Sequence, residues 1–271
     1  MEKFTKIREL YMPVQPAVRQ SGKNVVYREI APEDSLRTCI YCYWELKTTV
    51  PLEEQFNYRV VSDGCIDIFF SVESSDESFA MGFCKKYTEF PLDTSFHYMG
   101  IRFLPTMFPQ IFDIDATVLS NRYEWLHDVH KETARFLSAE IRSGQTLEQA
   151  KSSFDPYFGR LTSKTMFNTD NRLYGALGII LQNRGVINLN DDLDIGISQR
   201  QLRRLFKYYI GDTTKTFCKV VRFQNILRAK PSVQSLRKSK LFFDVGYYDQ
   251  AHFIKEFKNH YGVTPSTAFG R

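Results

Sequence analysis

The chain has 271 residues, enough for two domains, and its 43% hydrophobic and 25% charged residues are typical of a globular protein with a formal net charge of +5. It contains no apolar run of about 18 residues, which excludes a membrane-spanning helix. The start Met-Glu-Lys-Phe-Thr-Lys lacks the apolar core of an export signal. We therefore expect a cytoplasmic protein whose five cysteines are reduced thiols.

The N-terminal part is predicted to be rich in β-strands. β-Branched and aromatic residues dominate several short runs, which favours strands. The Asp63-Gly64 pair lies within one of these runs and is typical of a hairpin or a bend. Pro105 and Pro109 then interrupt the regular pattern. The predicted runs cover residues 38–46, 59–72, 79–84 and 98–104.

Helices are predicted to follow the strands. Apolar residues recur at helical spacing over residues 122–143, which predicts an amphipathic helix. Thr146 and Gln149 have the spacing of a capping box, which predicts a further helix that ends near Gly159. The polar residues 160–170 are predicted to be a linker.

No residue pattern indicates a catalytic, metal or cofactor site. Cys39 and Cys42 are spaced Cys-x-x-Cys, but in a strand their side chains face opposite sides of the sheet, so buried thiols are favoured over a metal or redox site. His127 and His130 could share one helix face, but zinc would need further ligands. The chain also lacks a phosphate-binding glycine loop and a Gly-x-Ser-x-Gly motif.

The C-terminal third is strongly basic. Residues 184–271 hold 16 Lys and Arg against 7 Asp and Glu, a net charge of +9, whereas the remaining residues carry −4. This asymmetry is typical of a module that binds nucleic acid. Its first helix is predicted over 170–183, with Asp170 or Thr169 as the N-cap and Gly185 as the stop.

A duplicated pattern lies within this basic third. The segment Ser198-Gln-Arg-Gln-Leu-Arg-Arg-Leu-Phe-Lys-Tyr-Tyr-Ile-Gly211 recurs 51 residues later as Asp249-Gln-Ala-His-Phe-Ile-Lys-Glu-Phe-Lys-Asn-His-Tyr-Gly262. Each copy begins with an N-cap residue and ends with a glycine that can adopt the left-handed conformation closing a helix. Gln201 completes a capping box with Ser198. The pattern predicts two matching helices.

Each predicted helix has an apolar and a polar face. In the first copy, Leu202, Leu205, Phe206 and Tyr209 recur at the spacing of one apolar stripe, opposite a face of basic residues. In the second copy, Phe253, Phe257 and Tyr261 are predicted to point inward. One basic amphipathic helix is more often a solvated surface than a reader of DNA, but two copies with the same caps favour DNA binding.

These residues resemble the AraC/XylS family of bacterial transcription regulators. The segment 246–265 is similar to the C-terminal signature of the family, 196–207 to its first helix-turn-helix and 221–228 to the helix that joins its two subdomains. The resemblance covers about residues 168–271. Ser62-Asp-Gly-Cys-Ile-Asp67 and Met99-Gly-Ile-Arg-Phe103 resemble the sensory β-domain of one branch of that family.

The resemblance implies an α+β fold with two domains. Residues 1–160 would form a β-rich sensory or dimerisation domain with C-terminal helices, and 168–271 an all-α domain in which a linker helix joins two helix-turn-helix subdomains. The two recognition helices would enter successive major grooves. By position, the residues implied to read base edges are Arg200, Arg203, Arg204, Gln250, Ala251, Ile254 and Lys255. Those implied to contact phosphate are Lys207, Arg222 and Lys258.

The sequence departs from the family pattern next to both recognition helices. Acidic residues occupy the helix expected before the first one, at Asp191, Asp192 and Asp194, and Phe242 replaces a small residue before the second. These departures leave open a ligand-binding or interaction protein whose helical tail no longer binds DNA. Another alternative is a thiol-based sensor or DNA-repair enzyme with a DNA-binding tail, in which Cys39, Cys42 or Cys65 is the nucleophile.

The leading hypothesis is a sequence-specific transcription regulator and not an enzyme. We expect double-stranded promoter DNA as its main partner, with RNA polymerase, a second copy of the chain and a small-molecule effector as further candidates. Aromatic residues are abundant in the N-terminal part, which suits an apolar pocket as well as a simple core. The sequence does not identify the effector or its contact residues, and no cofactor is expected.

Overall fold

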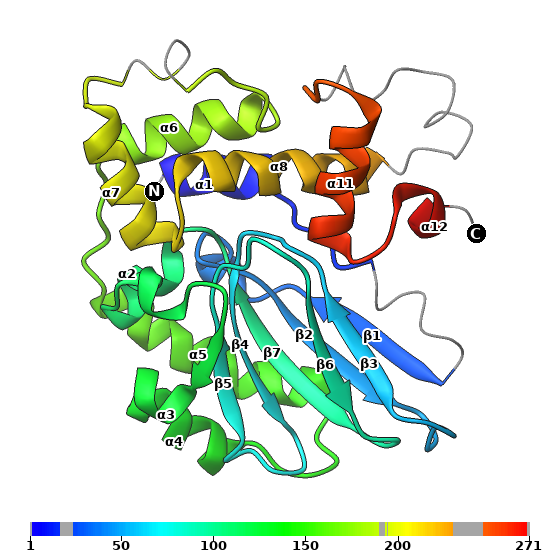
Figure 1. Cartoon of the computed structure of the whole chain (residues 1–271). Coiled ribbons are helices and arrows are strands. Elements are labelled where there is room, and N and C mark those ends of the chain that lie inside the picture. Colours follow the sequence, from blue (N-terminus) through cyan, green and yellow to red (C-terminus); the bar gives the residue numbers. More distant parts are fainter. Residues whose placement is uncertain (1, 17–23, 190–192, 194, 230–245, 270–271) are drawn as a thin grey trace.

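The computed structural model describes residues 2–16, 24–189, 193, 195–229 and 246–269. Its centre is a six-stranded antiparallel sheet in which sequence neighbours are often not sheet neighbours (Figure 1). Across the sheet, the strands follow the order β1 (Val25–Ile30), β2 (Ile40–Thr48), β7 (His97–Phe103), β4 (Ile66–Ser71), β5 (Ser78–Met81) and β8 (Tyr123–Trp125).

A second, two-stranded sheet covers one face of the first. It pairs β3 (Phe56–Val60) with β6 (Thr88–Leu92) in antiparallel register. An apolar cluster that includes Trp44 and Leu46 of β2 and Tyr58 of β3 fills the space between the two sheets. Side chains alternate along a strand, so residues from the same strands can serve this cluster and, on the opposite face, a separate core.

Helices cover that opposite face. Tyr43 of β2 packs on Phe154 with ring centroids 5.2 Å apart, and Phe103 of β7 packs on Phe158 at 5.8 Å. Both partner residues belong to α5, which therefore lies against the centre of the sheet. The helices of this layer are α2 (Met107–Phe112), α3 (Leu126–Val129), α4 (Lys131–Glu140) and α5 (Leu147–Lys164), with two 3₁₀ turns at Asp34–Leu36 and Ala116–Leu119.

The C-terminal helices form a layer beside one end of the sheet. The long helix α8 (Thr214–Ala229) runs through its middle, with α7 (Gln199–Ile210) near one end and α11 (Gln250–Tyr261) near the other (Figure 1). The layer also contains α6 (Asn171–Gln182) and α12 (Pro265–Phe269). The expected fold class, α+β with a β-rich part followed by an all-α part, is confirmed.

The first helix of the chain, α1 (Glu2–Leu10), packs on this C-terminal layer. Phe4 contacts Tyr174 of α6 at a ring distance of 5.1 Å, and Tyr11, just after α1, contacts Phe217 of α8 at 6.1 Å. One apolar core cluster therefore includes residues from both predicted domains. The division into 1–160 and 168–271 stays a prediction about how the chain is organised.

Several local expectations are confirmed, and the single helix predicted over 122–143 is wrong. The predicted strands near 38–46, 79–84 and 98–104 exist as β2, β5 and β7, and the Asp63-Gly64 pair forms a bend between β3 and β4, which lie in different sheets. The predicted helix 122–143 is instead a short strand and two helices. His130 is extended there, with φ −155°, and its side chain accepts a hydrogen bond from the Thr133 backbone to cap α4.

Proline and linker predictions also needed correction. Pro109 lies inside α2, where its missing N–H falls in the first turn of the helix and so costs no internal hydrogen bond. The helix that begins at the Thr146 capping box continues past Gly159 to Lys164, so only the end of the predicted linker is irregular. Within the described residues, no helix is both long and apolar enough to cross a lipid bilayer.

Candidate nucleic-acid interface and ligand pocket

The N-terminus of α7 has the predicted capping box. The Ser198 hydroxyl accepts a hydrogen bond from the Gln201 backbone N–H at 3.2 Å, and the Gln201 side chain accepts one from the Ser198 N–H at 3.1 Å. These two bonds satisfy donors that have no partner within the helix. Gly211 ends α7 with φ 103°. The local sequence therefore determines both ends of this helix.

The N-terminus and C-terminus of α11 repeat this arrangement at the same spacing. The Asp249 carboxylate accepts a hydrogen bond from the His252 N–H at 2.7 Å, and Gly262 ends the helix with φ 96°. The repeat continues into the next helix of each copy. Thr213 caps α8 by accepting from the Thr216 N–H at 3.2 Å, and Thr264 caps α12 by accepting from the Thr267 N–H at 3.4 Å.

The faces of α7 and α11 lie as the pattern predicts. Leu202 and Phe206 of α7, and Phe253 and Phe257 of α11, are buried. Leu205 and Tyr209 are half-buried at the edge of the first stripe. All ten sequence-predicted contact residues except Arg222 are exposed, namely Arg200, Arg203, Arg204, Lys207, Gln250, Ala251, Ile254, Lys255 and Lys258.

Arg222 of α8 has a different environment from the other predicted contacts. It is half-buried, and its guanidinium donates to the Gly246 carbonyl at 3.1 Å and to the Gly185 carbonyl at 3.1 Å. It also lies 5.1 Å from the Tyr247 ring centroid. Arg222 thus ties the end of α6 and the segment before α11 to the linker helix. Its phosphate contact stays a prediction.

A buried polar cluster orients α11 on α8. The Lys219 ammonium lies 2.7 Å from the Glu256 carboxylate, and although burial acts to raise the pKa of Glu256, the Lys219 contact holds it below its usual range. His260, one turn further along α11, stacks on Phe223 of α8 at 5.1 Å. Burial lowers the pKa of His260 to about 4, so this imidazole is neutral at physiological pH.

The β-domain contacts the C-terminal half of α11, which sequence reasoning did not anticipate. The Asn259 carbonyl accepts from the Tyr87 N–H at 3.1 Å, and the Asn259 amide donates to the Lys85 carbonyl at 3.2 Å. An open hollow of about 770 Å³ lies between these segments. Its lining residues are Lys86, Tyr87, Glu89, Lys219, His252, Lys255, Glu256, Lys258 and Asn259.

The hollow has a mainly positive charge, because both of its glutamates form ion pairs within the protein. Glu89 binds Arg59 at 2.6 Å, and Glu256 binds Lys219 at 2.7 Å. The cations that remain for an outside partner include Lys86 of the β-domain, next to Lys255 and Lys258 of α11. The only sequence signal for Lys86 is the Lys85-Lys86 pair in the turn before a strand, and it is too weak to mark the residue.

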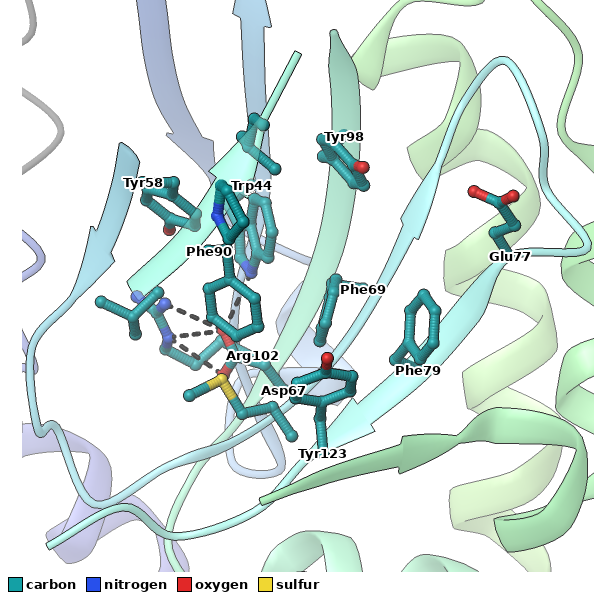
Figure 2. Close-up of a pocket in the computed structure, with 14 residues that line it drawn as sticks. Trp44, Tyr58, Asp67, Phe69, Glu77, Phe79, Phe90, Tyr98, Arg102 and Tyr123 are labelled. Carbon is teal, nitrogen blue, oxygen red and sulfur yellow. Dashed lines mark hydrogen bonds and ion pairs between the residues drawn. The ribbon is translucent and has the colours of Figure 1, made fainter. Parts of the chain in front are cut away.

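The β-domain contains a second cavity, of about 280 Å³, between its two sheets (Figure 2). Most of its lining is aromatic or aliphatic, which suits a small apolar ligand. The lining comes from both sheets and is formed by Trp44, Tyr58, Val60, Asp67, Phe69, Glu77, Phe79, Met81, Phe90, Pro91, Leu92, Tyr98, Arg102 and Tyr123.

An ion-pair network closes one side of this cavity. Arg102 of β7 is directly opposite Asp67 of β4, and its side chain is 1% exposed. The guanidinium contacts the Asp67 carboxylate at 2.9 Å, Asp63 at 3.3 Å and Glu29 at 3.4 Å. The Trp44 indole N–H donates to Asp67 at 3.0 Å. Several charged groups far apart in the sequence thus meet at the cavity wall.

The cysteines have the environments of core thiols. Cys39 and Cys42 are both buried and belong to the cores on opposite faces of the large sheet, as the strand pattern predicts. Burial raises the pKa of Cys39 to about 11 and that of Cys42 and Cys65 well above the usual value. Thiolates are therefore scarce at neutral pH, which argues against a nucleophile at these positions.

Two family models match parts of the chain. Residues 194–271 match the helix-turn-helix domain, and residues 28–124 match a domain of unknown function (DUF6597). No curated protein matches the chain.

Solved structures of ToxT resemble the fold. Apo ToxT with a lysine-to-alanine substitution, from Vibrio cholerae strain SCE256, is 11% identical with a TM-score of 0.44, covering 93% of this chain and 99% of that one. ToxT from Vibrio cholerae O395 is 12% identical with a TM-score of 0.42, and the match covers 81% of this chain and 94% of that one. The O395 protein bound to (E)-4-(8-methylnaphthalen-1-yl)but-3-enoic acid is 10% identical with a TM-score of 0.39, and the match covers 92% of this chain and 99% of that one.

The helix-turn-helix match includes the residues whose caps, spacing and exposed cations are described above. Residues 194–271 form a helix-turn-helix domain of the AraC type. This domain at residues 194–271 supports DNA-binding transcription regulation as the function of the chain.

Proposed function

We propose that this regulator reads a specific DNA sequence with α7 and α11, which enter successive major grooves on one face of the duplex. The observation that carries the proposal is the pair of helices with equivalent caps, spaced 51 residues apart and held near the two ends of α8. Each helix buries its apolar side and exposes its polar side. Successive major grooves lie about 34 Å apart along one face of DNA.

The exposed side chains supply the chemistry for base readout. Arg200, Arg203 and Arg204 can donate two hydrogen bonds to a guanine, and Gln250 can bond an adenine in the same way. Ala251 and Ile254 can contact a thymine methyl group. Lys207 and Lys258 are better suited to phosphate, which positions the protein without specifying a sequence. Asp191, Asp192, Asp194 and Phe242 lie outside the described residues.

Selection of bound sites from a random DNA pool tests the proposal directly. We expect enrichment of one sequence with two conserved blocks about one helical turn apart, each read by one helix. The proposal would be wrong if the full chain enriched no sequence at low salt. A single conserved block would mean that only one of the two helices reads bases.

Arg203→Ala is expected to cost about 1–3 kcal/mol of binding free energy on the selected site, because a bidentate contact to guanine is lost. The measurement is fluorescence anisotropy on the selected site and on a duplex with that base pair changed. Arg135→Ala, on the exposed side of α4, serves as the control and should leave both affinities unchanged. Equal weakening on every duplex would assign Arg203 to the phosphate backbone instead.

Lys86 is expected to contact a phosphate beside α11, although it belongs to the β-domain. Lys86→Gln should reduce the slope of log affinity against log salt by about 0.9, because one fewer counterion is released on binding. Lys131→Gln, an exposed lysine on α4, is the matched control. An unchanged slope in the Lys86 variant would show that DNA does not reach this hollow.

We further propose that the cavity between the two sheets holds a small-molecule effector. Its position supports this idea, because β3 lines the cavity and the chain just beyond β3 contacts α11. There, the Ser62 N–H donates to the His260 carbonyl at 3.3 Å. A ligand that moves β3 would therefore change the support of α11. RNA polymerase and a second copy of the chain remain further predicted partners.

A further inference from the structure

The cavity between the two sheets is surrounded by aromatic rings. Phe69 lies 5.3 Å from Phe79, 5.8 Å from Phe90 and 6.3 Å from Tyr123, measured between ring centroids. Figure 2 shows these four rings gathered in one part of the cavity, with Trp44 and Tyr98 further along it. Each ring has a negative face, which attracts a cation placed over it.

The charged groups of the lining have a negative balance. They are Asp67, Glu77 and Arg102, and Arg102 also contacts Asp63 and Glu29. The Arg102 guanidinium donates three hydrogen bonds to Asp67, at 3.1, 3.2 and 2.9 Å, and one to Glu29 at 3.4 Å. A bound acid would therefore meet an arginine whose donors are largely occupied, surrounded by carboxylates.

Glu77 differs from the other acidic groups of the cavity. Its side chain is exposed, and with the described residues its carboxylate forms no hydrogen bond or ion pair. Burial, followed by the nearby Glu77 charge, raises the pKa of Tyr98 on the adjacent wall. A free carboxylate at the edge of an aromatic cavity is complementary to a positive group and not to a second acid.

We propose that this cavity binds an organic cation with an apolar body, such as an aryl or alkyl ammonium. The rings would enclose the cationic group and its apolar body, and Glu77 would supply the opposite charge. The inference rests on the proposed use of the cavity as an effector site and names the chemical class of that effector.

The test uses three aromatic probes that differ in charge, two of which also share one shape. Phenyltrimethylammonium and tert-butylbenzene are isosteric, and only the first is charged, while 3-phenylpropanoate represents the opposite charge. Binding to the full chain is followed by tryptophan fluorescence, because Trp44 lines the cavity. We expect the cation to bind about tenfold more tightly than its neutral isostere, in keeping with cation–π attraction in a partly desolvated site. We expect 3-phenylpropanoate to bind more weakly than either.

Two variants and one control variant separate the effect of charge from that of shape. Glu77→Gln should weaken the binding of phenyltrimethylammonium about fivefold, as expected when one nearby charge is removed. The affinity for tert-butylbenzene should not change. Glu54→Gln, an exposed glutamate outside the cavity, should change neither affinity. Phe79→Leu should reduce the affinity for the cation more than the affinity for the neutral probe, because it removes a π-face but keeps an apolar side chain.

Three outcomes would overturn the inference: equal binding of the isosteres, tighter binding of 3-phenylpropanoate, or no binding of any probe. These assays contain no DNA, so their failure is distinguishable from that of DNA recognition. If the chain binds its selected DNA site but prefers the acid, the proposal of DNA recognition stands and only the proposal of a cationic effector is wrong.

Discussion

Arg102→Met is expected to lower the free energy of unfolding by about 3–5 kcal/mol, among the largest effects of any single substitution in this chain. Arg102 is 1% exposed and lies within 3.4 Å of three carboxylates. Removing the guanidinium leaves these carboxylates close together without a compensating charge. The side chain of methionine matches the arginine stem in volume, so the loss comes mainly from charge and not from a cavity.

Urea unfolding measures the effect, and two further variants interpret it. Arg37→Met is the control, because Arg37 is 52% exposed and its one ion pair within the described part of the chain is with Asp34, so a change within about 0.5 kcal/mol is expected. Adding Asp67→Asn to Arg102→Met should recover part of the loss, because one uncompensated charge is removed while the Trp44 N–H keeps an acceptor. If Arg102→Met were as stable as the control, the network would contribute nothing to the fold.

The loss should also depend on pH in a defined direction. Burial raises the pKa of Asp67 to about 6, and Arg102 opposes that rise. A carboxyl group with a raised pKa in the folded state lowers stability as pH increases from its unfolded pKa through its folded one. Without Arg102 the pKa of Asp67 should rise further. The Arg102→Met defect should therefore be smaller at pH 5 than at pH 7.5.

Gly185→Ala is expected to destabilise the helix-turn-helix region by about 2–4 kcal/mol. Gly185 has φ +75°, and its N–H donates to the Ile180 carbonyl at 2.8 Å to close α6. A Cβ atom there would lie 2.2 Å from the Cys218 carbonyl oxygen and 2.9 Å from the Arg222 nitrogen, both in the backbone of α8. Left-handed strain costs about 1–2 kcal/mol, and the collision with a helix backbone adds to it.

The chain offers a matched control for this substitution. Gly144 has φ +77°, but no atom lies within 4 Å of the Cβ position. Gly144→Ala should therefore show the backbone strain alone, about 1 kcal/mol. Thermal unfolding compares the two variants, and anisotropy on the selected DNA site should show a loss of affinity only for Gly185→Ala. Equal destabilisation by the two substitutions would mean that α6 and α8 can separate at little cost.

Sequence reasoning succeeded where the structure depends on residues close together in the chain. The caps at Ser198 and Asp249, the stops at Gly211 and Gly262, and the buried and exposed faces of α7 and α11 all follow from residues within a few positions of one another. Hydrogen bonds at a helix end and the 3.6-residue period are local properties, so they can be read from a short window.

The failures show where local signals compete. The helical spacing of residues 122–143 was real, but Tyr123–Trp125 pairs with β5, and His130 adopts an extended conformation that caps α4. Pairing with a distant strand thus outweighed the local preference. The contacts of Arg222 were also not visible in the sequence, because its guanidinium donates to carbonyl groups of two separate segments, and its phosphate contact stays a prediction.

The sequence by itself determined the two duplicated helices, their polar surfaces and the β-rich character of the N-terminal part. Only the tertiary structure decided that Arg102 meets Asp67 from 35 residues away, that aromatic residues of both sheets enclose one cavity, and that Lys85 lies against Asn259, 174 residues later. The reason is physical. Caps and amphipathic faces form within one or two turns of chain, whereas a cavity wall or a buried ion pair exists only after distant strands have paired and excluded water.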